Sequence, residues 1–384
     1  MIGVAILGTG AIARVHMDAY RQFPELCEVR AFCDINREKA ETMAREAGRT
    51  DAFCSDDYRE VIERRDIDLV SICLPPSVHG ETAIHALDAG KHVLLEKPMA
   101  SSLYECDLIL DAVARSGKKL SVVSQNRFQT TMMRLRHVLT SGVAGRVLHG
   151  LVHSFWWRGQ SYYDLSWRGT WEKEGGGCTL NHAVHHVDLL LWMMGMPESV
   201  SSFITNLNHD NSETEDFSTS LLVYPGGSLA QLTASLVHHG EEQEMVFQCE
   251  KARVSFPWKT YASRSLENGF PERDEELENR IQKSYNEVAP LPQEGHAAQI
   301  RDVLSAINGE TEVLVDGVAA RRTLELITGV YKSFQTGDTV SFPLEKTDPF
   351  YRGETLVERM PRFHQKTRSR DSFSTSDISL GRQG

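Results

Sequence analysis

A short apolar segment followed at once by closely spaced glycines constrains this chain more than any other feature. Residues 3–7 have the composition of a buried strand, and the next six residues lead into a pattern of helical period. In that context Gly8 permits a tight turn, Gly10 lets the backbone approach a pyrophosphate, and the helix N-terminus offers its amides to phosphate oxygens. Ala13 replaces a third glycine and still allows close packing. We therefore expect a dinucleotide to bind at Gly8, Thr9, Gly10, Ala11, Ile12 and Ala13.

Asp34 distinguishes this glycine pattern from a chance match. It ends the second expected strand, residues 29–33, about twenty residues after the glycines. A carboxylate there accepts hydrogen bonds from the adenosine ribose hydroxyls and repels a 2′-phosphate. We expect NAD as the cofactor, with NADP disfavoured, although Arg37 could meet a phosphate or be an ordinary solvated helix residue. A Rossmann-like domain that binds no nucleotide is the alternative for the whole group.

Residues 1–123 alternate short apolar runs with longer segments of helical period, which is typical of a parallel sheet covered by helices. The expected strands are residues 3–7, 29–33, 69–74, 92–95 and 120–123, and the expected helices are residues 11–23, 37–47, 58–64, 79–89 and 103–116. We therefore expect a doubly wound α/β domain of Rossmann type that binds NAD.

After residue 124 the rhythm changes to strands in series. We expect helices at 132–141, 179–194, 293–307 and 317–335, and strands at 146–157, 200–207, 217–224, 228–236, 244–249, 252–256 and 339–342. Consecutive strands predict an open, mainly antiparallel sheet in an α+β domain at residues 124–345, and the broad apolar face of such a sheet favours oligomers. The acidic stretch 271–279 is expected to be a solvated loop or helix face. Residues 346–384 are expected to be a C-terminal extension or an arm onto a neighbour.

Length and charge limit the partners of the chain. Its 384 residues exceed what one core supports, and 53 acidic against 41 basic residues give a net charge of -12, which disfavours nucleic acid. No apolar run approaches the ~18 residues that cross a bilayer, and the opening residues do not resemble a signal peptide, so we expect a cytoplasmic protein without membrane partners. The seven cysteines are scattered, without a Cys-x-x-Cys pair, which argues against a disulfide framework or a thiolate zinc site.

Two further segments stand at the carboxyl ends of expected strands, where open α/β sheets bind ligands. One contains Leu74, Pro75 and His79, and the other contains Glu96, Lys97 and Pro98. A lysine set against a proline at a strand end has restricted backbone geometry, unlike a surface lysine in a loop. We expect cofactor contacts from Leu74, Pro75, His79, Glu96 and Lys97.

A third segment, residues 175–188, has a flexible turn of three glycines followed by a histidine-rich helix. On one continuous helix Asn181 and His185 share a face, as do His182 and His186. The three histidines could share a zinc ion, but no His-Glu-x-x-His pattern accompanies them and helix-start histidines are more often satisfied by hydrogen bonds, so we expect no metal. Cys178 is expected to be a buried residue and not a nucleophile.

These motifs and their order along the chain resemble those of the glucose-fructose oxidoreductase and inositol dehydrogenase (Gfo/Idh/MocA) family of NAD(P)-dependent oxidoreductases. The resemblance covers residues 1 to about 345 and rests on the glycine turn, Asp34, Pro75-x-x-x-His79, Glu96-Lys97-Pro98, Asn126-Arg127-Phe128, Trp167-Arg168, Gly175-Gly176-Gly177 and Asn181-x-x-x-His185. It implies a Rossmann domain with a cofactor contact from Asn126, an α+β domain that holds the substrate and whose sheet supports homodimers or homotetramers, and a cis Lys97–Pro98 bond. It also implies that Lys97 and His185 flank the substrate carbon that faces the nicotinamide.

One departure concerns Asn181, because many members have aspartate there. An amide cannot act as a base, so an Asp-His proton relay is in doubt. Asparagine also occurs in the family, including among members that oxidise sugar-nucleotide uronic acids, and Asn181 would then hydrogen-bond a substrate hydroxyl.

The resemblance predicts an NAD-dependent oxidoreductase that moves a hydride between nicotinamide and a secondary alcohol carbon of a sugar, an inositol or a sugar derivative. His185 would accept the hydroxyl proton and Lys97 would polarise the oxygen, with the reverse assignment open. Substrate contacts are expected from Lys97, Arg127, Tyr162, Tyr163, Trp167, Arg168, Asn181, His182 and His185, with core packing as the alternative for the aromatic residues. A glycosidase or isomerase that uses bound NAD transiently, and a non-catalytic NAD-binding regulator, are the alternative functions.

Overall fold

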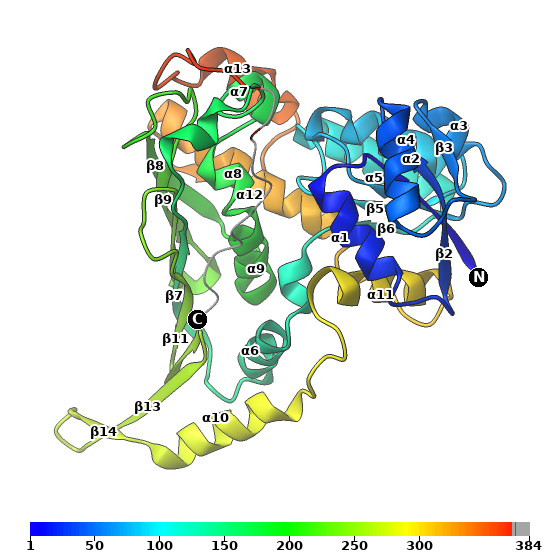
Figure 1. Cartoon of the computed structure of the whole chain (residues 1–384). Coiled ribbons are helices and arrows are strands. Elements are labelled where there is room, and N and C mark those ends of the chain that lie inside the picture. Colours follow the sequence, from blue (N-terminus) through cyan, green and yellow to red (C-terminus); the bar gives the residue numbers. More distant parts are fainter. Residues whose placement is uncertain (371–372, 374–384) are drawn as a thin grey trace. The chain divides into compact units, whose positions relative to one another are not determined.

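The computed structural model describes residues 1–370 and 373, and the chain divides into two compact units (Figure 1). Unit 1 comprises Met1–Gln129 and Leu291–Arg321. Unit 2 comprises Thr130–Pro290 and the residues from Arg322 onward. Among the described residues, no helix is long and apolar enough to cross a membrane.

Six parallel strands form the sheet of unit 1. They are β1 (Ile2–Leu7), β2 (Cys27–Cys33), β3 (Phe53–Ser55), β4 (Leu69–Ile72), β5 (His92–Leu95) and β6 (Leu120–Val122), in the spatial order β3-β2-β1-β4-β5-β6. The order runs in opposite directions on the two sides of the β1–β4 pair. This confirms the doubly wound α/β fold, in which ligands bind where the strand order reverses.

Local sequence signals set the boundaries of the helices in unit 1. The helices are α1 (Ala11–Tyr20), α2 (Arg37–Glu46), α3 (Tyr58–Ile62), α4 (His79–Asp88), α5 (Leu103–Ser116) and α11 (Gly295–Ile307). Asn36, Asp57 and Ser102 accept hydrogen bonds from N–H groups in the first turns of α2, α3 and α5. Gly117, whose φ of 65° favours glycine, caps the C-terminal end of α5.

Helix α11 belongs to unit 1, although it lies far along the chain from the rest of that unit. Ile300, Val303 and Leu304 are part of the same buried cluster as Val4 and Met17. The division therefore differs from the expected boundaries at residues 123 and 345, because residues 291–321 return to the first unit. Periodicity predicted the helix but could not show which core it joins, since its packing partners are distant in sequence.

A nine-stranded sheet is the framework of unit 2, in the order β14-β13-β12-β11-β7-β10-β9-β8-β15. Its strands are β7 (Val147–Phe155), β8 (Ser199–Thr205), β9 (Phe217–Val223), β10 (Leu229–Ser235), β11 (Gln243–Cys249), β12 (Ala252–Phe256), β13 (Lys259–Ser265), β14 (Pro271–Arg273) and β15 (Val340–Ser341). β7 and β10 pair in parallel, whereas the other neighbours pair antiparallel. The expected open, mainly antiparallel sheet is confirmed.

The strands of this sheet alternate between buried and more exposed residues. Along β8, Val200 and Ile204 are buried, whereas Phe203 is 76% exposed. Leu221 of β9 is also exposed. Alternation of this kind is typical of an antiparallel sheet with one face against the core. The homo-oligomer expected to form through this sheet stays a prediction.

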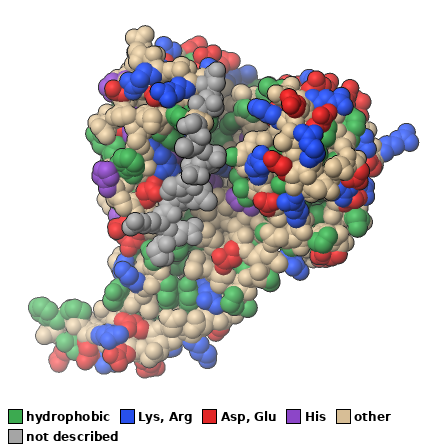
Figure 2. Space-filling model, in the orientation of Figure 1, with side chains coloured by type: hydrophobic (Ala, Val, Ile, Leu, Met, Phe, Trp, Pro, Cys, Tyr) green, Lys and Arg blue, Asp and Glu red, His purple; other side chains and the backbone are tan. Residues whose placement is uncertain are grey.

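One end of the sheet is the hairpin of β13 and β14, which is followed by α10 (Glu275–Glu287). Figure 2 shows apolar side chains among charged ones on this hairpin, where Phe270 is 68% exposed. The stretch 271–279, expected to be a loop or helix face, forms β14 and the first turn of α10. Acidic residues in that turn suit the positive end of the helix dipole.

The remaining helices pack in unit 2 together with the C-terminal residues. They are α6 (Thr130–Ser141), α7 (Trp171–Glu174), α8 (Cys178–Asn181), α9 (Val184–Met194), α12 (Gly317–Thr336, in this unit from Arg322) and α13 (Glu354–Arg359). Residues 361–370, expected to be part of a tail or an arm onto a neighbour, lie against other segments of the same unit. Residues 371–372 and 374–384 of the expected arm lie outside the described residues.

Candidate active site

The glycine turn after β1 has the close backbone approach that the sequence predicts. Gly8 has a φ of +87°, and a Cβ atom on it would lie 2.4 Å from the carbonyl oxygen of Cys73. Around Gly10, a Cβ atom would meet no atom of the described residues within 4 Å. Helix α1 begins at Ala11 without a side-chain cap. The turn therefore offers space and N–H donors that fit a pyrophosphate.

Asp34 follows β2, in the position expected for a carboxylate that binds ribose. Its Oδ2 accepts hydrogen bonds from N and Oγ1 of Thr9 at 3.1 and 2.7 Å, and its Oδ1 accepts one from N of Asn36 at 3.0 Å. Burial opposes ionisation, but the hydrogen bonds from Asn36 and Thr9 hold the pKa of Asp34 below its usual value. The next residue, Ile35, is 95% exposed and presents apolar surface beside this carboxylate. The residues present fit an adenosine group.

Two surface pockets adjoin this region. One of about 410 Å³ is lined by Thr9, Arg14, Asn36, Glu38, Lys39, Thr42 and Met43, and one of about 620 Å³ includes Arg37. Nε of Arg37 donates to Oε1 of Glu41 at 3.1 Å, the usual pair of a solvated helix face. A contact between Arg37 and the cofactor stays a prediction.

Two buried side chains fix the backbone around Lys97. His79 places Nδ1 2.8 Å from the carbonyl oxygen of Pro98 and Nε2 2.8 Å from that of Leu74, so it joins the segments that follow β4 and β5. Oε2 of Glu96 accepts the N–H of Lys97 at 3.1 Å. The Lys97–Pro98 bond is cis, as the resemblance implied. Both ring nitrogens of His79 contact backbone carbonyls, and a contact between His79 and a cofactor stays a prediction.

A buried histidine in turn holds Glu96. His16 of α1 contacts Oε1 of Glu96 through Nε2 at 3.0 Å and Oγ of Ser71 through Nδ1 at 2.8 Å. Burial opposes the charge on each partner of this pair. The contacts with Cys73 and Glu96 nevertheless raise the pKa of His16 to about 10, and His16 holds the pKa of Glu96 at about 2. His296 completes a group whose ligand atoms lie within 4.8 Å of one another, but hydrogen bonds already occupy both ring nitrogens of His16.

The segment after β6 is held by α11. Gln299 accepts the N–H of Ser124 at 2.9 Å and donates to the carbonyl oxygen of Val122 at 2.8 Å. Asn126 is half-buried and Arg127 is 5% exposed in the 3₁₀ turn that follows. Their contacts with cofactor and substrate stay predictions.

In unit 2, close packing requires glycine at two of the three glycine positions before α8. A Cβ atom on Gly176 would lie 2.2 Å from the hydroxyl of Tyr331, and one on Gly177 would lie 1.9 Å from the carbonyl oxygen of Glu215. The buried carboxylate of Glu215 accepts hydrogen bonds from N of Gly177 and N of Thr179 at 3.0 and 3.1 Å, and from Tyr331 at 3.0 Å. The expectation of a flexible turn is therefore wrong, because a buried acid holds it.

The helix expected over residues 179–194 is broken into α8 and α9 at His182 and Ala183. The N–H of Ala183 bonds to the carbonyl oxygen of Cys178, five residues back, at 2.9 Å. This π-type turn means that Asn181 and His185 do not lie on one regular helix, and that expectation is wrong. Cys178 is buried, and burial raises the pKa of its thiol, as expected for a core residue.

The side chain of Asn181 is used within the glycine turn. Its Nδ2 donates to the carbonyl oxygens of Gly176 and Gly177 at 2.7 and 3.2 Å. His185 is half-buried in the first turn of α9, whereas His186 is 3% exposed and burial lowers its pKa to about 4. Within the described chain, the helix histidines do not converge as metal ligands would.

Arg168 lies between two aromatic rings in the loop before α7. Its guanidinium carbon is 4.1 Å from the ring centre of Trp167 and 4.2 Å from that of Tyr162, and Nη1 donates to Glu174 at 3.0 Å. Burial raises the pKa of Glu174 to about 7. Trp167 is 44% exposed, and the hydroxyl of Tyr162 lies 3.3 Å from Nε2 of His182. The cluster combines aromatic faces with a fixed cation.

Two residues near this cluster differ from the sequence-based expectations. Tyr163 is 1% exposed with its ring edge-on to Tyr162, so core packing, the alternative considered above, describes it. The guanidinium carbon of Arg158 lies over the ring of Tyr162, 5.7 Å from its centre, and Arg158 pairs with Glu241. Arg158 was not among the expected site residues, because it belongs to none of the sequence motifs singled out above.

Comparison with known proteins brings these features together. Residues 2–124 match the Gfo/Idh/MocA family described as "Oxidoreductase family, NAD-binding Rossmann fold", and residues 132–255 match the "GFO/IDH/MocA C-terminal domain". The chain is 24% identical over 357 residues to D-glucoside 3-dehydrogenase of Escherichia coli K12, covering 88% of this chain and 96% of that protein. It is 28% identical to the WlbA dehydrogenase of Chromobacterium violaceum, solved with NADH and UDP-GlcNAcA, with a TM-score of 0.77 and coverage of 90% and 96%. A shorter match, 27% identical over 189 residues, covers 46% of this chain and 41% of a glycosyl hydrolase family 109 protein of Shewanella putrefaciens.

The two family matches cover different parts of the structure. The first includes the glycine turn, Asp34 and Lys97, so unit 1 contains an NAD-binding Rossmann domain. The second includes the glycines before α8 and most strands of the larger sheet. Together they match more than half of the chain, which belongs to the Gfo/Idh/MocA family of NAD-binding oxidoreductases.

Proposed function

We propose that this protein transfers a hydride between NAD and a secondary alcohol carbon of a sugar, an inositol or a sugar derivative, with sugar nucleotides and uronic acids among the candidates. The main support is the guanidinium of Arg168 held between the rings of Trp167 and Tyr162. Aromatic faces suit the C–H surfaces of sugars, and guanidinium donors bind hydroxyls or carboxylates. One relative is named D-glucoside 3-dehydrogenase, and another was solved with NADH and UDP-GlcNAcA. Both support a sugar derivative as the substrate.

In this proposal His185 and Lys97 assist the reaction at the hydroxyl. Oxidation of an alcohol needs a base for the hydroxyl proton and a donor or cation for the developing alkoxide. Bound NAD supplies the hydride acceptor. His185 takes the proton and Lys97 polarises the oxygen, with the reverse assignment as the alternative. The side chain of Lys97 starts from a backbone that Glu96 and His79 hold in place.

The proposal assigns the cofactor contacts to the turn after β1 and to the strand ends of unit 1. Asp34 selects NAD over NADP, because its fixed carboxylate would repel a 2′-phosphate. The pyrophosphate is received by the N–H groups at the start of α1. The other proposed contacts are Arg37, Leu74, Pro75, His79, Glu96, Lys97 and Asn126.

A substrate screen followed by two substitutions tests this function. NADH formation is measured with aldoses, inositols, uronic acids and nucleotide sugars. With the identified substrate, Lys97→Ala and His185→Ala should each lower turnover by ~10² to 10⁴-fold, while calorimetry shows nearly unchanged NAD affinity. The double variant should lose far less than the product of the single losses. Wild-type turnover in His185→Ala would contradict the mechanism.

Matched controls separate chemistry from general damage. Lys251→Ala changes an exposed lysine at a strand turn of unit 2, and His137→Ala changes a partly exposed histidine on α6. Both should keep wild-type turnover and NAD affinity. Asn181→Ala should act mainly on substrate KM, with a smaller loss of turnover.

A glycosidase or isomerase that uses bound NAD transiently is the second candidate, favoured by the match to a glycosyl hydrolase family 109 protein. Such an enzyme would convert its substrate without accumulating NADH. A dehydrogenase accumulates NADH in proportion to oxidised product. A non-catalytic regulator would bind NAD and do neither, so one assay of NADH and product separates all three.

A further inference from the structure

Residues 361–370, here called the C-terminal strap, pair with the aromatic loop, residues 159–170. The N–H of Arg370 donates to the carbonyl oxygen of Asp164 at 2.6 Å, and the N–H of Ser166 donates to the carbonyl oxygen of Arg370 at 2.9 Å. These two bonds form a short parallel bridge. The strap therefore provides hydrogen-bond partners for backbone groups in the middle of the loop that contains the proposed sugar-binding cluster.

Asn211, between β8 and β9, joins the strap to the aromatic loop. It is fully buried, and its Oδ1 accepts the N–H groups of Thr367 and Arg368 at 2.8 and 2.9 Å. Its Nδ2 lies 3.0 Å from the carbonyl oxygen of Tyr163, 3.0 Å from Oδ1 of Asp164 and 2.9 Å from the carbonyl oxygen of Arg368. One amide thus uses its acceptor on the strap and its donors on both segments.

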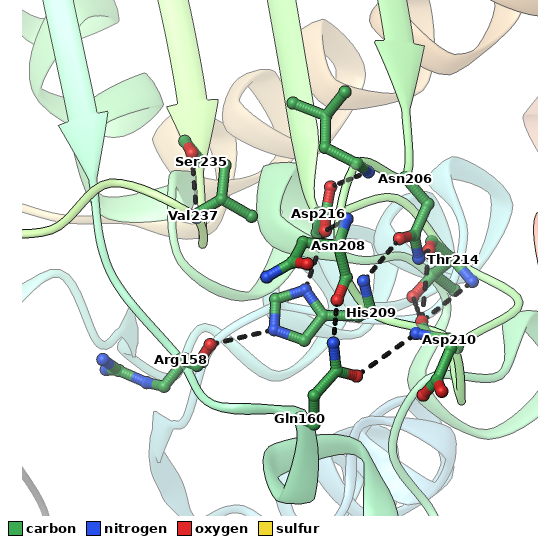
Figure 3. A network of polar contacts seen from close by, with 12 residues as sticks. Arg158, Gln160, Asn206, Asn208, His209, Asp210, Thr214, Asp216, Ser235 and Val237 are labelled. Carbon is green, nitrogen blue, oxygen red and sulfur yellow. Dashed lines mark hydrogen bonds and ion pairs between the residues drawn. The ribbon is translucent and has the colours of Figure 1, made fainter.

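The loop between β8 and β9 is itself held by buried polar contacts. Figure 3 shows His209 between Asp216, 2.7 Å from Nδ1, and the carbonyl oxygen of Arg158, 3.0 Å from Nε2. Asp216 also accepts two backbone N–H groups of the same loop. Gln160 bonds to the backbone on either side of His209. Because Arg158 directly precedes the aromatic loop and Gln160 is its second residue, these contacts fix where that loop begins.

Charged side chains of the strap add further contacts. Nε of Arg368 donates to Asp164 at 3.2 Å, and Nη2 donates to Asp210 at 2.6 Å. Lys366 donates to the carbonyl oxygen of Tyr163. The Arg368 side chain is 45% exposed, and exposed ion pairs stabilise little. The buried amide of Asn211 and the backbone bridge therefore contribute more to the attachment than these ion pairs do.

We propose that the C-terminal strap is a positioning segment for the substrate: it holds the aromatic loop in the conformation in which Tyr162, Trp167 and Arg168 meet the sugar. Without the strap, the N–H of Ser166 and the buried amide of Asn211 lose partners, and buried polar groups without partners drive rearrangement. The effect on substrate rests on the proposed function, whereas the effect on the loop does not.

Two shortened chains test the proposal. A chain ending at Met360 lacks the strap, whereas a chain ending at Arg370 keeps every contact named above. Relative to the full chain, the Met360 chain should show a KM for the identified sugar raised about 10- to 100-fold, a smaller change in kcat and unchanged NAD affinity. Amides of residues 159–170 should also exchange hydrogen faster. The chain ending at Arg370 should match the full chain in all four measurements.

A milder pair of variants covers the case in which the Met360 chain does not fold. Arg368→Gln removes the ion pairs to Asp164 and Asp210, whereas Arg362→Gln removes only a 3.7 Å pair to Glu213. Arg368→Gln should raise KM about two- to fivefold and speed exchange in the aromatic loop, and Arg362→Gln should do neither.

The proposal would be overturned if the aromatic loop exchanged hydrogen equally fast in the full chain and the Met360 chain. It would also be overturned if Arg368→Gln and Arg362→Gln had the same KM and the same exchange rates in that loop. If the full chain oxidises no sugar or polyol, the proposed function fails instead. The exchange comparison needs no substrate and still decides whether the strap holds the loop.

Discussion

Gly10→Ala should separate cofactor binding from folding. No described atom lies within 4 Å of the position that the alanine Cβ would take. The backbone at Gly10, with φ -74° and ψ -170°, is one that alanine adopts without strain. Replacing glycine under these conditions restricts the unfolded chain and stabilises the fold by about 0.4–1 kcal/mol. The expected rise in Tm is roughly 1–4 °C.

The same substitution should weaken NAD binding. The space beside Gly10 is where the backbone would approach a pyrophosphate most closely, and an added methyl group would enter it. Forcing a methyl group into a packed contact costs about 1–3 kcal/mol. That corresponds to a Kd for NAD raised roughly 5- to 150-fold. Calorimetric titration with NAD beside thermal unfolding without NAD measures both effects on one sample.

Gly8→Ala is the matched control, because its surroundings are the opposite. At φ +87° and 2.4 Å from the carbonyl oxygen of Cys73, an alanine Cβ is both strained and crowded. This variant should lower Tm by several degrees even without NAD, since a left-handed alanine alone costs about 1–2 kcal/mol. The reasoning is refuted if Gly10→Ala binds NAD as tightly as the wild type, or if it unfolds more easily than Gly8→Ala.

Asp34→Ala should narrow or reverse the preference for NAD over NADP, because the carboxylate that repels a 2′-phosphate is lost; a wild type with the higher kcat/KM for NADP would show that Asp34 is not the selecting residue. The protein should form a homodimer or homotetramer at micromolar concentration, since Phe203 and Leu221 expose apolar surface on the sheet of unit 2. Light scattering checks this, and a monomer mass of 43.2 kDa would refute it. The His16–Glu96 pair should stabilise the fold most between about pH 4.5 and 6.5. The stability contributed by Glu96 is fully present above its ordinary pKa of 4.5 and is lost as the pH falls towards about 2. The stability contributed by His16 is fully present below its ordinary pKa of 6.5 and is lost as the pH rises through about 10. Replacing both residues by leucine should flatten the dependence of Tm on pH, and an unchanged profile would count against the pair.

Local signals were enough to predict most elements of unit 1. The range expected for α5, residues 103–116, matches the structure because a Ser102 cap and Gly117 mark its two ends. The strand at 92–95 also matches, since four residues of β5 pair between β4 and β6. Caps and periodicity are properties of neighbouring residues, so the sequence contains them directly.

Elements that depend on distant partners were not predicted. β13 has a single buried residue, Ala262, and β14 is exposed throughout, so neither has an apolar pattern to detect. These strands exist because they pair with a neighbour. The break between α8 and α9 likewise has no local breaker residue at His182 or Ala183. It follows from the hydrogen bond to Cys178 and from the buried acid that holds the turn.

In the candidate site, the residues proposed to contact ligands could be predicted from the sequence, whereas the residues that hold them in place could not. Residues that meet a ligand in the proposed function, such as Asp34 and Lys97, stand at strand ends that the pattern predicts. Residues that hold them do not, because Glu96 contacts His16 eighty positions away and Arg168 depends on a loop attached to Asn211. Supporting residues of this kind become visible only when the chain is folded.

Asn181 connects the packing of the glycine turn with the chemistry proposed for His185. Its amide donates to the carbonyl oxygens of Gly176 and Gly177, and a carboxylate at this place would face those oxygens without a proton to donate. The turn cannot move away, because both glycines are packed tightly against Tyr331 and Glu215. The amide at position 181 therefore supplies hydrogen bonds to this turn that an ionised carboxylate could not supply. It follows that any anionic partner for a protonated His185 has to come from a residue other than 181.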